Sequence, residues 1–496
     1  LQKTNNMAAS NIIQKPLYPN MPVGQEIIFV IENNDAVQNQ KQVKFGVNVH
    51  ISNDTMPSVS VTTHLVGTFK TTPNNTGVGI FDFRNVMENY VSAEQMTNWY
   101  SFANIGSQYK GIWSTARQQF PIHLIDKWMR SPKSVAFMVL EFFVEYLGAT
   151  DANNLSDPNV VRRADGTEVS SIEYTFYNSY VKYNDRKQTF NYDFGYSLLK
   201  FFPVSGLLPF IPTTKFLTNA PTTQFANIDD YGTVATLCPS EQVENFIDHM
   251  ELTYYDCDDN QIGQEEVQNN TVNGGSSSYI PILTNKQMLF CAVYPGNLQN
   301  WSTTFQALVA AGTIQGGKIT FRLFDHGSPK LASTKLYTIK LNCPEQKGYE
   351  PIRLCWLNQW GAWDYHTFTK KSTRTIKTKG TNYNQLSGTW NEGYYHQHSY
   401  KGGEKKFRVN GVERIKMNTD FLSEDFNVIF EELTNSPEVY MLEGYQNDQA
   451  FAMLNQYVKP VRLTTSSFTR KTIANDKLIQ YTFEIEKSKT LRTQSI

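Results

Sequence analysis

Along most of this chain, apolar and polar side chains alternate with a period of two residues. The alternation is clear in EIIFVIEN (26–33), KFGVNVHIS (44–52) and SVSVTTHLVGTFK (58–70), and Asn, Asp or Pro residues separate these segments. Successive side chains of a strand point to opposite faces of a sheet, so this period predicts strands with one buried face. Many short strands divided by turns are typical of sandwiches and barrels. We therefore predict an all-β chain of several β-sandwich domains, with a few short helices.

Further strands follow from the same pattern. A hairpin that turns through DDNQ is expected over residues 249–267, and a strand followed by a hairpin through ANDK over residues 457–488. A high content of Val, Ile, Phe and Tyr favours strands over helices in the other segments. These segments span residues 134–148, 172–184, 318–325, 336–342 and 351–358.

Two segments have helical spacing instead. Residues 423–434 are predicted to form a helix, with Ser423 as its N-cap and with Glu424 and Asp425 at the positive end of the helix dipole. A weaker helix is expected at 81–92. The apolar residues of the first helix follow the spacing of a buried stripe, at Phe426, Ile429, Phe430 and Leu433.

The 496 residues correspond to about three domains at roughly 150 residues each. A Pro/Thr-rich passage, FIPTTKFLTNAPTTQ (210–224), surrounds Phe216, and the composition changes near Thr369. We predict β-sandwich domains at 1–215 and 216–368, and a C-terminal assembly domain at 369–496. The assembly domain is expected to contain a basic arm (370–416), the short helix (423–434) and a closing β-hairpin.

Composition limits the classes of function. The net charge of −1 gives no general reason to expect nucleic-acid binding, and the apolar run at 135–144 is too short to span a bilayer and contains Glu141. We therefore expect neither membrane insertion nor a nucleic-acid partner. An odd number of cysteines without paired spacing predicts buried free thiols in a reducing compartment, at Cys238, Cys257, Cys291, Cys343 and Cys355.

Charge is unevenly distributed near the C-terminal end. Residues 366–416 contain 11 Lys/Arg and three Glu, whereas residues 420–448 contain 8 Asp/Glu and no Lys/Arg. The two segments can neutralise each other within the fold, or they can pair between identical subunits and fix their register. Nucleic-acid binding by the basic segment is a third interpretation. The interface candidates are Lys370, Lys371, Arg374, Lys377, Lys379, Lys405, Lys406, Arg408, Glu424, Asp425, Glu431 and Glu432.

No catalytic motif is present in the sequence. It contains no Gly-x-Ser-x-Gly elbow, phosphate loop, His-Glu-x-x-His helix or dinucleotide fingerprint, so we expect neither an enzyme nor a cofactor. His396 and His398 can share one face of a strand, with His366 as a third metal ligand, but accidental pairing explains them better. The calcium-like DCDDNQIG (256–263) lacks the sixth-position Gly and the twelfth-position Glu, and is expected to be a hairpin turn.

The segment RLCWLNQWGAWDYHTF (353–368) contains three of the 8 tryptophans. In an uninterrupted strand Trp356 and Trp360 would share a face, while Gly361 favours a bulge that redirects Trp363. These rings form either an exposed sugar-binding platform or a buried plug at a domain junction, and we favour the junction. Asp364 is expected to cap a turn, and the adjacent Glu431 and Glu432 to lie on a solvated helix face.

Four segments resemble virion structural proteins of tailed bacteriophages, particularly those of marine and Bacteroidota-infecting phages. They are IRLCWLNQWGAWDYHTFTKKSTRTI (352–376), FLTNAPTTQFANIDDYGTVATL (216–237), VIFEELTNSPEVYML (428–442) and VRLTTSSFTRKTIANDKLIQYTFEIEKS (461–488). The resemblance touches about two-thirds of the chain, and its motifs carry no active-site residues.

The resemblance implies a protein of the tail, baseplate or neck of a virion that is assembled in the host cytoplasm. Such a protein would act as a homo-oligomer and would dock other virion proteins, with any contact to host-surface glycans being indirect. Two alternatives remain open. One is a carbohydrate-binding module or glycosidase that uses the tryptophan platform, and the other is a capsid lattice or decoration protein.

Overall fold

The fold is mainly β, as the sequence predicts, with five sheets and a few short helices. It was obtained as a computed structural model. The residues described are 10–16, 20–53, 56–95, 121–125, 127–147, 161–164, 174–181, 215–238, 247–269, 287–325, 334–342, 349–389, 393–443, 457–472, 479–489 and 491–492. Within them, no helix has both the length and the apolar character needed to cross a membrane.

The N-terminal part is a β-sandwich. A six-stranded sheet (order β2-β10-β8-β4-β5, with β9 beside β8) packs on a three-stranded sheet (order β1-β3-β6). Aromatic rings such as Phe29 and Phe142 meet between the two sheets, with centroids 5.9 Å apart. The strands are β1 (Asn11–Gln14), β2 (Asn20–Pro22), β3 (Ile28–Glu32), β4 (Lys41–Ser52), β5 (Leu65–Thr71), β6 (Val78–Asp82), β8 (Val135–Leu147), β9 (Val161–Ala164) and β10 (Tyr174–Tyr177).

The helix predicted at 81–92 is largely wrong. Only α2 (Arg84–Met87) is helical, and Asp82 ends strand β6, which pairs with β3 from Ile28 to Glu32. Pairing with a distant strand overrides the local helical spacing here. A second short helix, α1 (Asn34–Asn39), was not predicted.

The middle part contains two sheets. Their orders are β11-β17-β16-β13-β14 and β12-β15-β7, and β7 (Trp128–Arg130) comes from the segment assigned by sequence to the first domain. Helices α4 (Pro295–Trp301) and α5 (Thr303–Ala310) accompany these sheets. The other strands are β11 (Thr223–Ala226), β12 (Thr233–Cys238), β13 (Ile247–Tyr255), β14 (Gln261–Gln268), β15 (Gln287–Ala292), β16 (Lys318–Asp325) and β17 (Tyr337–Leu341).

The predicted hairpin at 249–267 is confirmed as β13 and β14. The Asp256 carboxylate closes its turn by accepting hydrogen bonds from the backbone N–H groups of Asp258 (2.9 Å) and Asn260 (2.8 Å). Asp259 adopts the left-handed conformation, with φ of 64°. The acidic side chain that begins the calcium-like pattern thus stabilises the turn itself.

The C-terminal part is an eight-stranded sheet with the order β19-β18-β22-β23-β24-β21-β20, and β25 pairs with β21. Because β18 and β19 belong to this sheet, the boundary expected at residue 368 falls inside it. The chain turn ANDK of the closing hairpin lies outside the described residues. The strands are β18 (Ile352–Leu357), β19 (Trp363–Phe368), β20 (Thr373–Gln385), β21 (Gly403–Asn418), β22 (Val439–Leu442), β23 (Val458–Leu463), β24 (Thr482–Lys487) and β25 (Leu491–Arg492).

The helix predicted at 423–434 is present as a 3-10 turn (Glu424–Phe426) followed by α6 (Asn427–Asn435). Its predicted apolar stripe is buried in the core of the C-terminal sheet. The Ser423 side chain makes no capping hydrogen bond, contrary to the prediction, and its backbone oxygen accepts from the N–H of Phe426 instead. The tight first turn thus gives a backbone N–H group at the start of the helix the hydrogen-bond acceptor that a side-chain cap would have given it.

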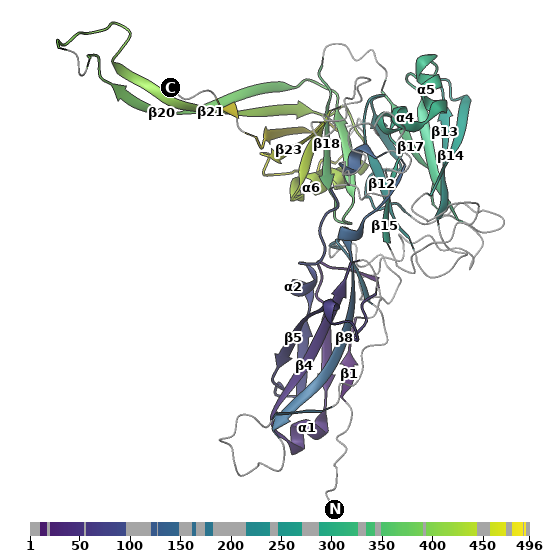
Figure 1. The fold of residues 1–496 in the computed structure, drawn as a ribbon. Helices are drawn as coiled ribbons and strands as arrows, with labels where there is room; N and C mark the ends of the chain where they lie inside the picture. The colour runs from purple at the N-terminus through teal and green to yellow at the C-terminus, as the bar shows by residue number, and fades with distance from the viewer. Residues whose placement is uncertain are drawn as a thin grey trace, which may run out of the picture.

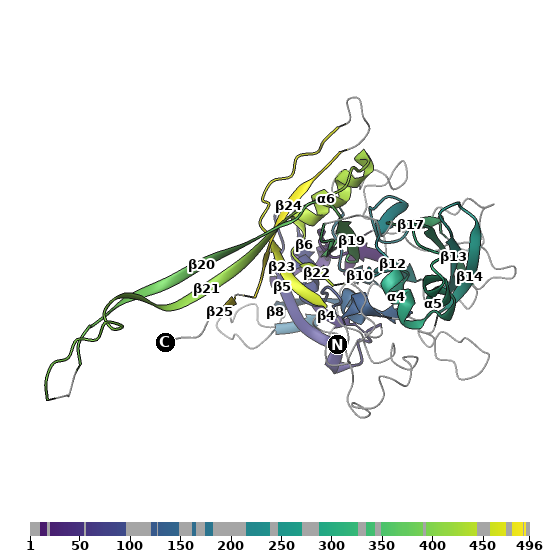
Figure 2. The same cartoon turned by 90° about the horizontal axis from the view of Figure 1, so that it is seen from above.

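The described parts form three regions. We call the N-terminal sandwich the stalk, the middle and C-terminal parts together the head, and the hairpin of β20 and β21 the arm. The N-terminal sandwich extends below the middle and C-terminal parts, which lie side by side (Figure 1). Strands β20 and β21 extend far beyond the other strands as a ribbon, on the side away from β13 and β14 (Figures 1 and 2).

Candidate functional site

The arm formed by β20 and β21 is an antiparallel hairpin. The two strands pair from Thr373↔Lys416 to Gln385↔Gly403, with one bulge between Thr381 and Asn382. The extended hairpin expected from the sequence is therefore present. At about 3.3 Å per residue, the 13 residues of β20 span roughly 43 Å.

Most of the arm has only two strands. On the side of β21 away from β20, β24 pairs with residues 414–418 and β25 with residues 410–411. No described strand pairs with the outer edge of β20, which ends the sheet. A two-stranded ribbon is marginally stable alone in water, and an open edge is a template for another strand.

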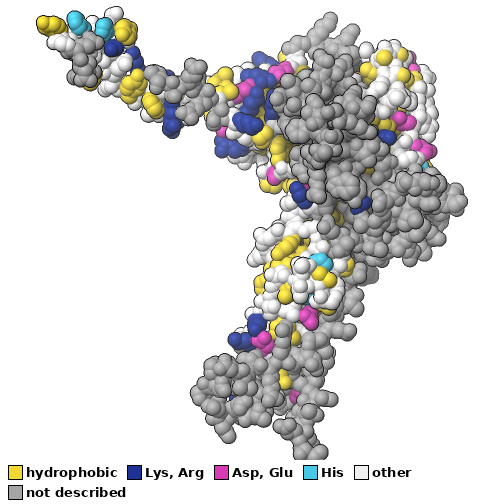
Figure 3. Space-filling model, in the orientation of Figure 1, with side chains coloured by type: hydrophobic (Ala, Val, Ile, Leu, Met, Phe, Trp, Pro, Cys, Tyr) yellow, Lys and Arg dark blue, Asp and Glu magenta, His cyan; other side chains and the backbone are white. Residues whose placement is uncertain are grey.

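Apolar and aromatic side chains are exposed along the arm. Ile376 is 58% and Phe407 49% exposed, and Tyr383 contacts the Phe407 ring edge-on with centroids 6.5 Å apart. Figure 3 shows apolar and basic side chains together on the arm. The segment that joins the two strands adds further exposed residues, namely Leu386, Tyr394, Tyr395 and Tyr400.

The basic interface candidates have two different environments. At the base of the arm, Lys370 pairs with Asp420 (3.0 Å) and Arg374 with Glu413 (2.8 Å) and Glu350. Further out, Lys405 Nζ donates to the backbone oxygen of Tyr400, and four cations form no ion pair with a described residue. These four are Lys377, Lys379, Lys406 and Arg408.

No described acid of the segment 420–448 forms an ion pair with the outer arm. Apart from the pair of Asp420 with Lys370, its ion pairs in the described chain join it to cations at 459–470. Glu424 and Asp425 are exposed beside α6. The pairs are Glu431 with Arg470 and Glu443 with Lys459.

The tryptophan platform does not exist. Trp356, Trp360 and Trp363 are 0%, 1% and 3% exposed, so their faces are unavailable to a sugar. Trp356 packs in the C-terminal core, whereas Trp360 and Trp363 pack in the core of the middle part, because β18 ends at Leu357 and the strand does not continue to Trp360. The indole N–H of Trp363 donates to the backbone oxygen of Glu94 (2.9 Å). The three rings lie where the parts of the molecule meet.

The turn between β18 and β19 redirects the rings. The Asn358 side-chain oxygen accepts from the backbone N–H groups of Trp360 (3.0 Å) and Ala362 (3.1 Å), and its amide donates to the backbone oxygen of Leu217 (2.8 Å). Gly361 has φ of +79°, and a Cβ atom there would lie 2.0 Å from the backbone oxygen of Asn178. Only glycine fits this close approach to the N-terminal sandwich.

Asn358→Ala is expected to lower the free energy of unfolding by about 2 kcal/mol, because it leaves buried backbone groups without partners. Urea unfolding followed by tryptophan fluorescence measures the change. Asn384→Ala, at an exposed position on the arm, is the matched control and should have no effect. Equal stability of the two variants would contradict the role of Asn358 in the turn.

A buried ionic network joins β18 to the middle part. Arg353 donates to the backbone oxygen of Tyr231 (2.6 Å), to Thr367 (2.8 Å) and to the Asp230 carboxylate (3.3 Å). Thr367 donates in turn to Asp230 (2.5 Å). The guanidinium also stacks over the Tyr294 ring, 4.6 Å from its centroid. Arg353 and the residues that it contacts are buried, so the network holds the C-terminal part and the middle part together.

Cys355 and His123 form the only thiol–imidazole contact given by the described residues, 3.6 Å from Sγ to Nε2. Burial raises the pKa of the Cys355 thiol well above its usual range and lowers the pKa of His123 to about 3. Both groups are therefore neutral at physiological pH. His123 also bonds to the Tyr365 hydroxyl (2.9 Å). A neutral, enclosed pair lacks the thiolate that nucleophilic catalysis needs, so this contact is structural.

Asp364 and Glu432 form a buried acidic pair. Asp364 lies within β19 opposite Trp356, so the prediction that it caps a turn is wrong. Its Oδ1 accepts from the Thr218 hydroxyl (2.5 Å), and Glu432 Oε1 accepts from the Asn219 amide (2.5 Å). Burial raises the pKa of Asp364 to about 6, partly offset by hydrogen bonds that include one with Glu432. Glu432 is thus buried, not solvated as predicted, because α6 packs against the segment at 218–219.

The three histidines considered as metal ligands are not brought together. His366 is buried among the rings of Phe426 and Phe430, and burial lowers its pKa to about 3. His396 is exposed and His398 is half-buried near the end of the arm. Among the residues that the structure describes, no group of three or more His, Cys, Asp or Glu could hold a metal ion.

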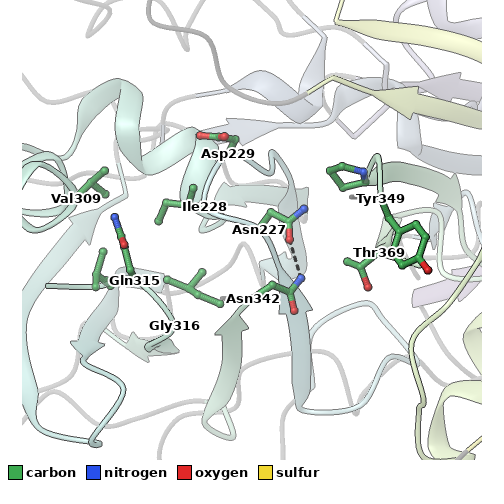
Figure 4. Close-up of a pocket in the computed structure, with 12 residues that line it drawn as sticks. Asn227, Ile228, Asp229, Val309, Gln315, Gly316, Asn342, Tyr349 and Thr369 are labelled. Carbon is green, nitrogen blue, oxygen red and sulfur yellow. Dashed lines mark hydrogen bonds between the residues drawn. The ribbon is translucent and has the colours of Figure 1, made fainter. Parts of the chain in front are cut away.

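A cavity of about 330 Å³ lies beside α5 in the middle part (Figure 4). Asn342 donates a side-chain hydrogen bond to Asn227 (2.7 Å) across it, and Asp229 and Tyr349 also contribute to its wall. Burial raises the pKa of Asp229. The described lining combines one acid with amides and apolar groups, and it presents no paired nucleophile and base.

Sequence reasoning missed Arg353, Asp230 and His123, which build the junction. One signal was available for Arg353, a charged residue inside the apolar strand IRLCWL, because a cation in such a strand needs a buried partner. Nothing in the local sequence marks Asp230 or His123 as that partner or its neighbour. Three described cysteines are free, as predicted, and Cys291 and Cys355 are buried. Cys257 is exposed, contrary to the prediction of buried thiols, because it lies in the turn between β13 and β14.

The arm is therefore the feature with the clearest capacity to bind something outside the chain. Comparison with known proteins adds no constraint, since no protein-family model matches the chain and no curated protein matches it.

Proposed function

We propose that this chain is a structural protein of a tailed-phage virion, in the tail, baseplate or neck, that self-assembles and docks neighbouring virion proteins. Its assignment to a phage particle rests on the sequence resemblance of segments such as 352–376. Self-assembly rests on one observation, the two-stranded arm that extends from the head with an open edge and uncovered apolar side chains (Figure 1). No catalytic step is part of the proposal.

The arm costs stability unless something covers it. A ribbon of two strands buries little apolar surface, and Ile376 and Phe407 are about half exposed. Native edge strands usually avoid unwanted pairing by being short or by being covered. Strand β20 is a long edge strand of 13 residues, and this supports a role in binding another protein.

Arm truncation is expected to weaken self-association more than about tenfold, because it removes the outer part of the open edge, while leaving the head folded. In this variant Asn-Gly joins Lys379 directly to Asn410, two residues that face each other in the hairpin, and replaces residues 380–409. The contacts of β21 with β24 and β25 begin at Asn410 and are retained. Light scattering should then report a monomer, with an unchanged thermal unfolding midpoint. Oligomers of wild-type size in the truncated protein would contradict assembly through the arm.

Location in the particle is tested by immunogold labelling of purified virions. Label at the tail, baseplate or neck is the expected result. Label over the whole shell would favour the capsid lattice or decoration protein instead, and absence from particles would contradict the virion proposal itself.

A further inference from the structure

We propose that the outer edge of β20 in one copy of this chain adds to the outer edge of β14 in the next copy, forming a continuous sheet between subunits. This inference rests on the proposed self-assembly and names its two surfaces. Both strands end their sheets, since β20 follows β21 and β14 follows β13 with no described strand beyond. Each therefore presents alternate backbone N–H and C=O groups outward.

The distribution of charge favours β14 as the strand to which β20 of the next copy adds, and we call it the acceptor strand. The hairpin of β13 and β14 contains no Lys or Arg between residues 248 and 268 but seven acids. In its register Glu266 lies directly opposite Glu251, and like charges in such a position are unfavourable. Glu251 is neutralised by Arg322 (3.0 Å). Among the described residues, the Glu266 carboxylate accepts a hydrogen bond only from the side-chain amide of Gln268 (2.9 Å). It also lies 3.7 Å from Nε2 of His249, whose Nδ1 is 2.6 Å from Asp248.

A strand beyond β14 can supply the missing cation. Lys377 and Lys379 are two residues apart on β20, so they lie on the same face of the arm. Both are exposed and form no ion pair with a described residue. Addition of β20 to β14 would bring this basic face beside Glu266, while the strand edges exchange main-chain hydrogen bonds.

The same charges disfavour pairing of two arms. An antiparallel contact between the β20 strands of two copies would bring Lys377 and Lys379 of one copy near the same residues of the other. Attraction requires a different, acidic edge. Strands β20 and β14 lie on opposite sides of the head in both views (Figures 1 and 2). A contact between two different surfaces repeats from copy to copy, so the product is a ring or a filament.

Two full-length variants test the pairing. The arm variant carries Lys377→Glu and Lys379→Glu, and the acceptor variant carries Asp258→Lys and Glu266→Lys, all at exposed positions. In each variant alone, the side chain at position 266 and those at positions 377 and 379 carry charges of the same sign, so its self-association should weaken more than about tenfold. An equimolar mixture restores opposite charges at every contact. Sedimentation velocity should therefore show monomers for each variant and wild-type-sized assemblies for the mixture.

Several outcomes would overturn the inference. If each variant assembles as the wild type does, or if the mixture stays monomeric, β20 does not pair with β14, although self-assembly of the wild type would stand. A wild-type protein that remains monomeric would overturn the self-assembly proposal as well. A third outcome is that the wild type stays monomeric but binds duplex DNA, and that only the arm variant loses this binding. This outcome would identify nucleic acid as the partner of the arm and would overturn the self-assembly proposal.

Hydrogen exchange provides a second measurement. On assembly of the wild type, amides in β20 and β14 should both become protected, because each edge gains main-chain partners. Protection of β20 without β14 would place the arm on a different surface and would contradict the pairing.

Discussion

Arg353→Leu is expected to lower the free energy of unfolding by about 3–5 kcal/mol, because it leaves the Asp230 carboxylate buried without its cation. The variant also removes the hydrogen bond to the backbone oxygen of Tyr231 and the stacking on Tyr294. Since Arg353 joins the C-terminal sheet to the middle part, denaturant unfolding should change from one transition toward two.

Arg322→Leu is the matched control. Arg322 is likewise paired with a carboxylate, donating twice to Glu251, but its side chain is 39% exposed and the expected loss is below about 1 kcal/mol. The double variant Arg353→Leu/Asp230→Leu should be less destabilised than Arg353→Leu, because no charge is then left buried alone. Equal losses for Arg353→Leu and Arg322→Leu would show that the buried network does not hold the two parts together.

Asp364→Asn is expected to stabilise the protein by about 2–3 kcal/mol at pH 8 and to have little effect at pH 4. Burial raises the pKa of Asp364 from the usual 3.8 to about 6, so the folded state binds this proton more tightly than the unfolded chain does. The stabilisation from the proton is complete below about pH 4 and is lost as the pH rises through 6. One pKa unit corresponds to about 1.4 kcal/mol, which sets the magnitude.

The asparagine keeps the acceptor for Thr218 and offers an N–H in place of the lost proton. Urea unfolding between pH 4 and pH 8 measures the effect, and the wild-type curve should fall across this range more steeply than that of the variant. Asp420→Asn, which changes a partly exposed acid, should leave the slope unchanged. Parallel curves for the wild type and Asp364→Asn would exclude Asp364 as the source of the slope.

Features with a local cause could be predicted from the sequence. The stripe of α6 is buried as its spacing indicates, and the basic segment forms the extended arm. Helices α4 and α5 were missed although local signals exist, with Pro295 in the first turn of α4 and Ser302 accepting a hydrogen bond from the N–H of Phe305 at the start of α5. Each of those signals involves only one or two residues. They lie between segments predicted as strands, in which apolar residues recur every second position.

Features with a distant cause could not be predicted. Glu432 is buried because Asn219, more than two hundred positions away, supplies its hydrogen bond. Trp356 and Trp360 lie in different cores because the Asn358 turn separates them and Gly361 approaches the backbone of Asn178. The partners of a junction come from several sheets, and their meeting depends on the packing of whole parts of the molecule.

The position of β24 has a consequence for biosynthesis. This strand follows β21, β22 and β23 in the chain, yet it lies inside the C-terminal sheet, paired with β23 on one side and with β21 on the other. The ribosome must therefore release residues 482–487 before the arm can be anchored to the rest of its sheet. Until then the arm has no fixed direction relative to the head, so under the proposed self-assembly a new chain cannot join its neighbours before residues 482–487 have left the ribosome.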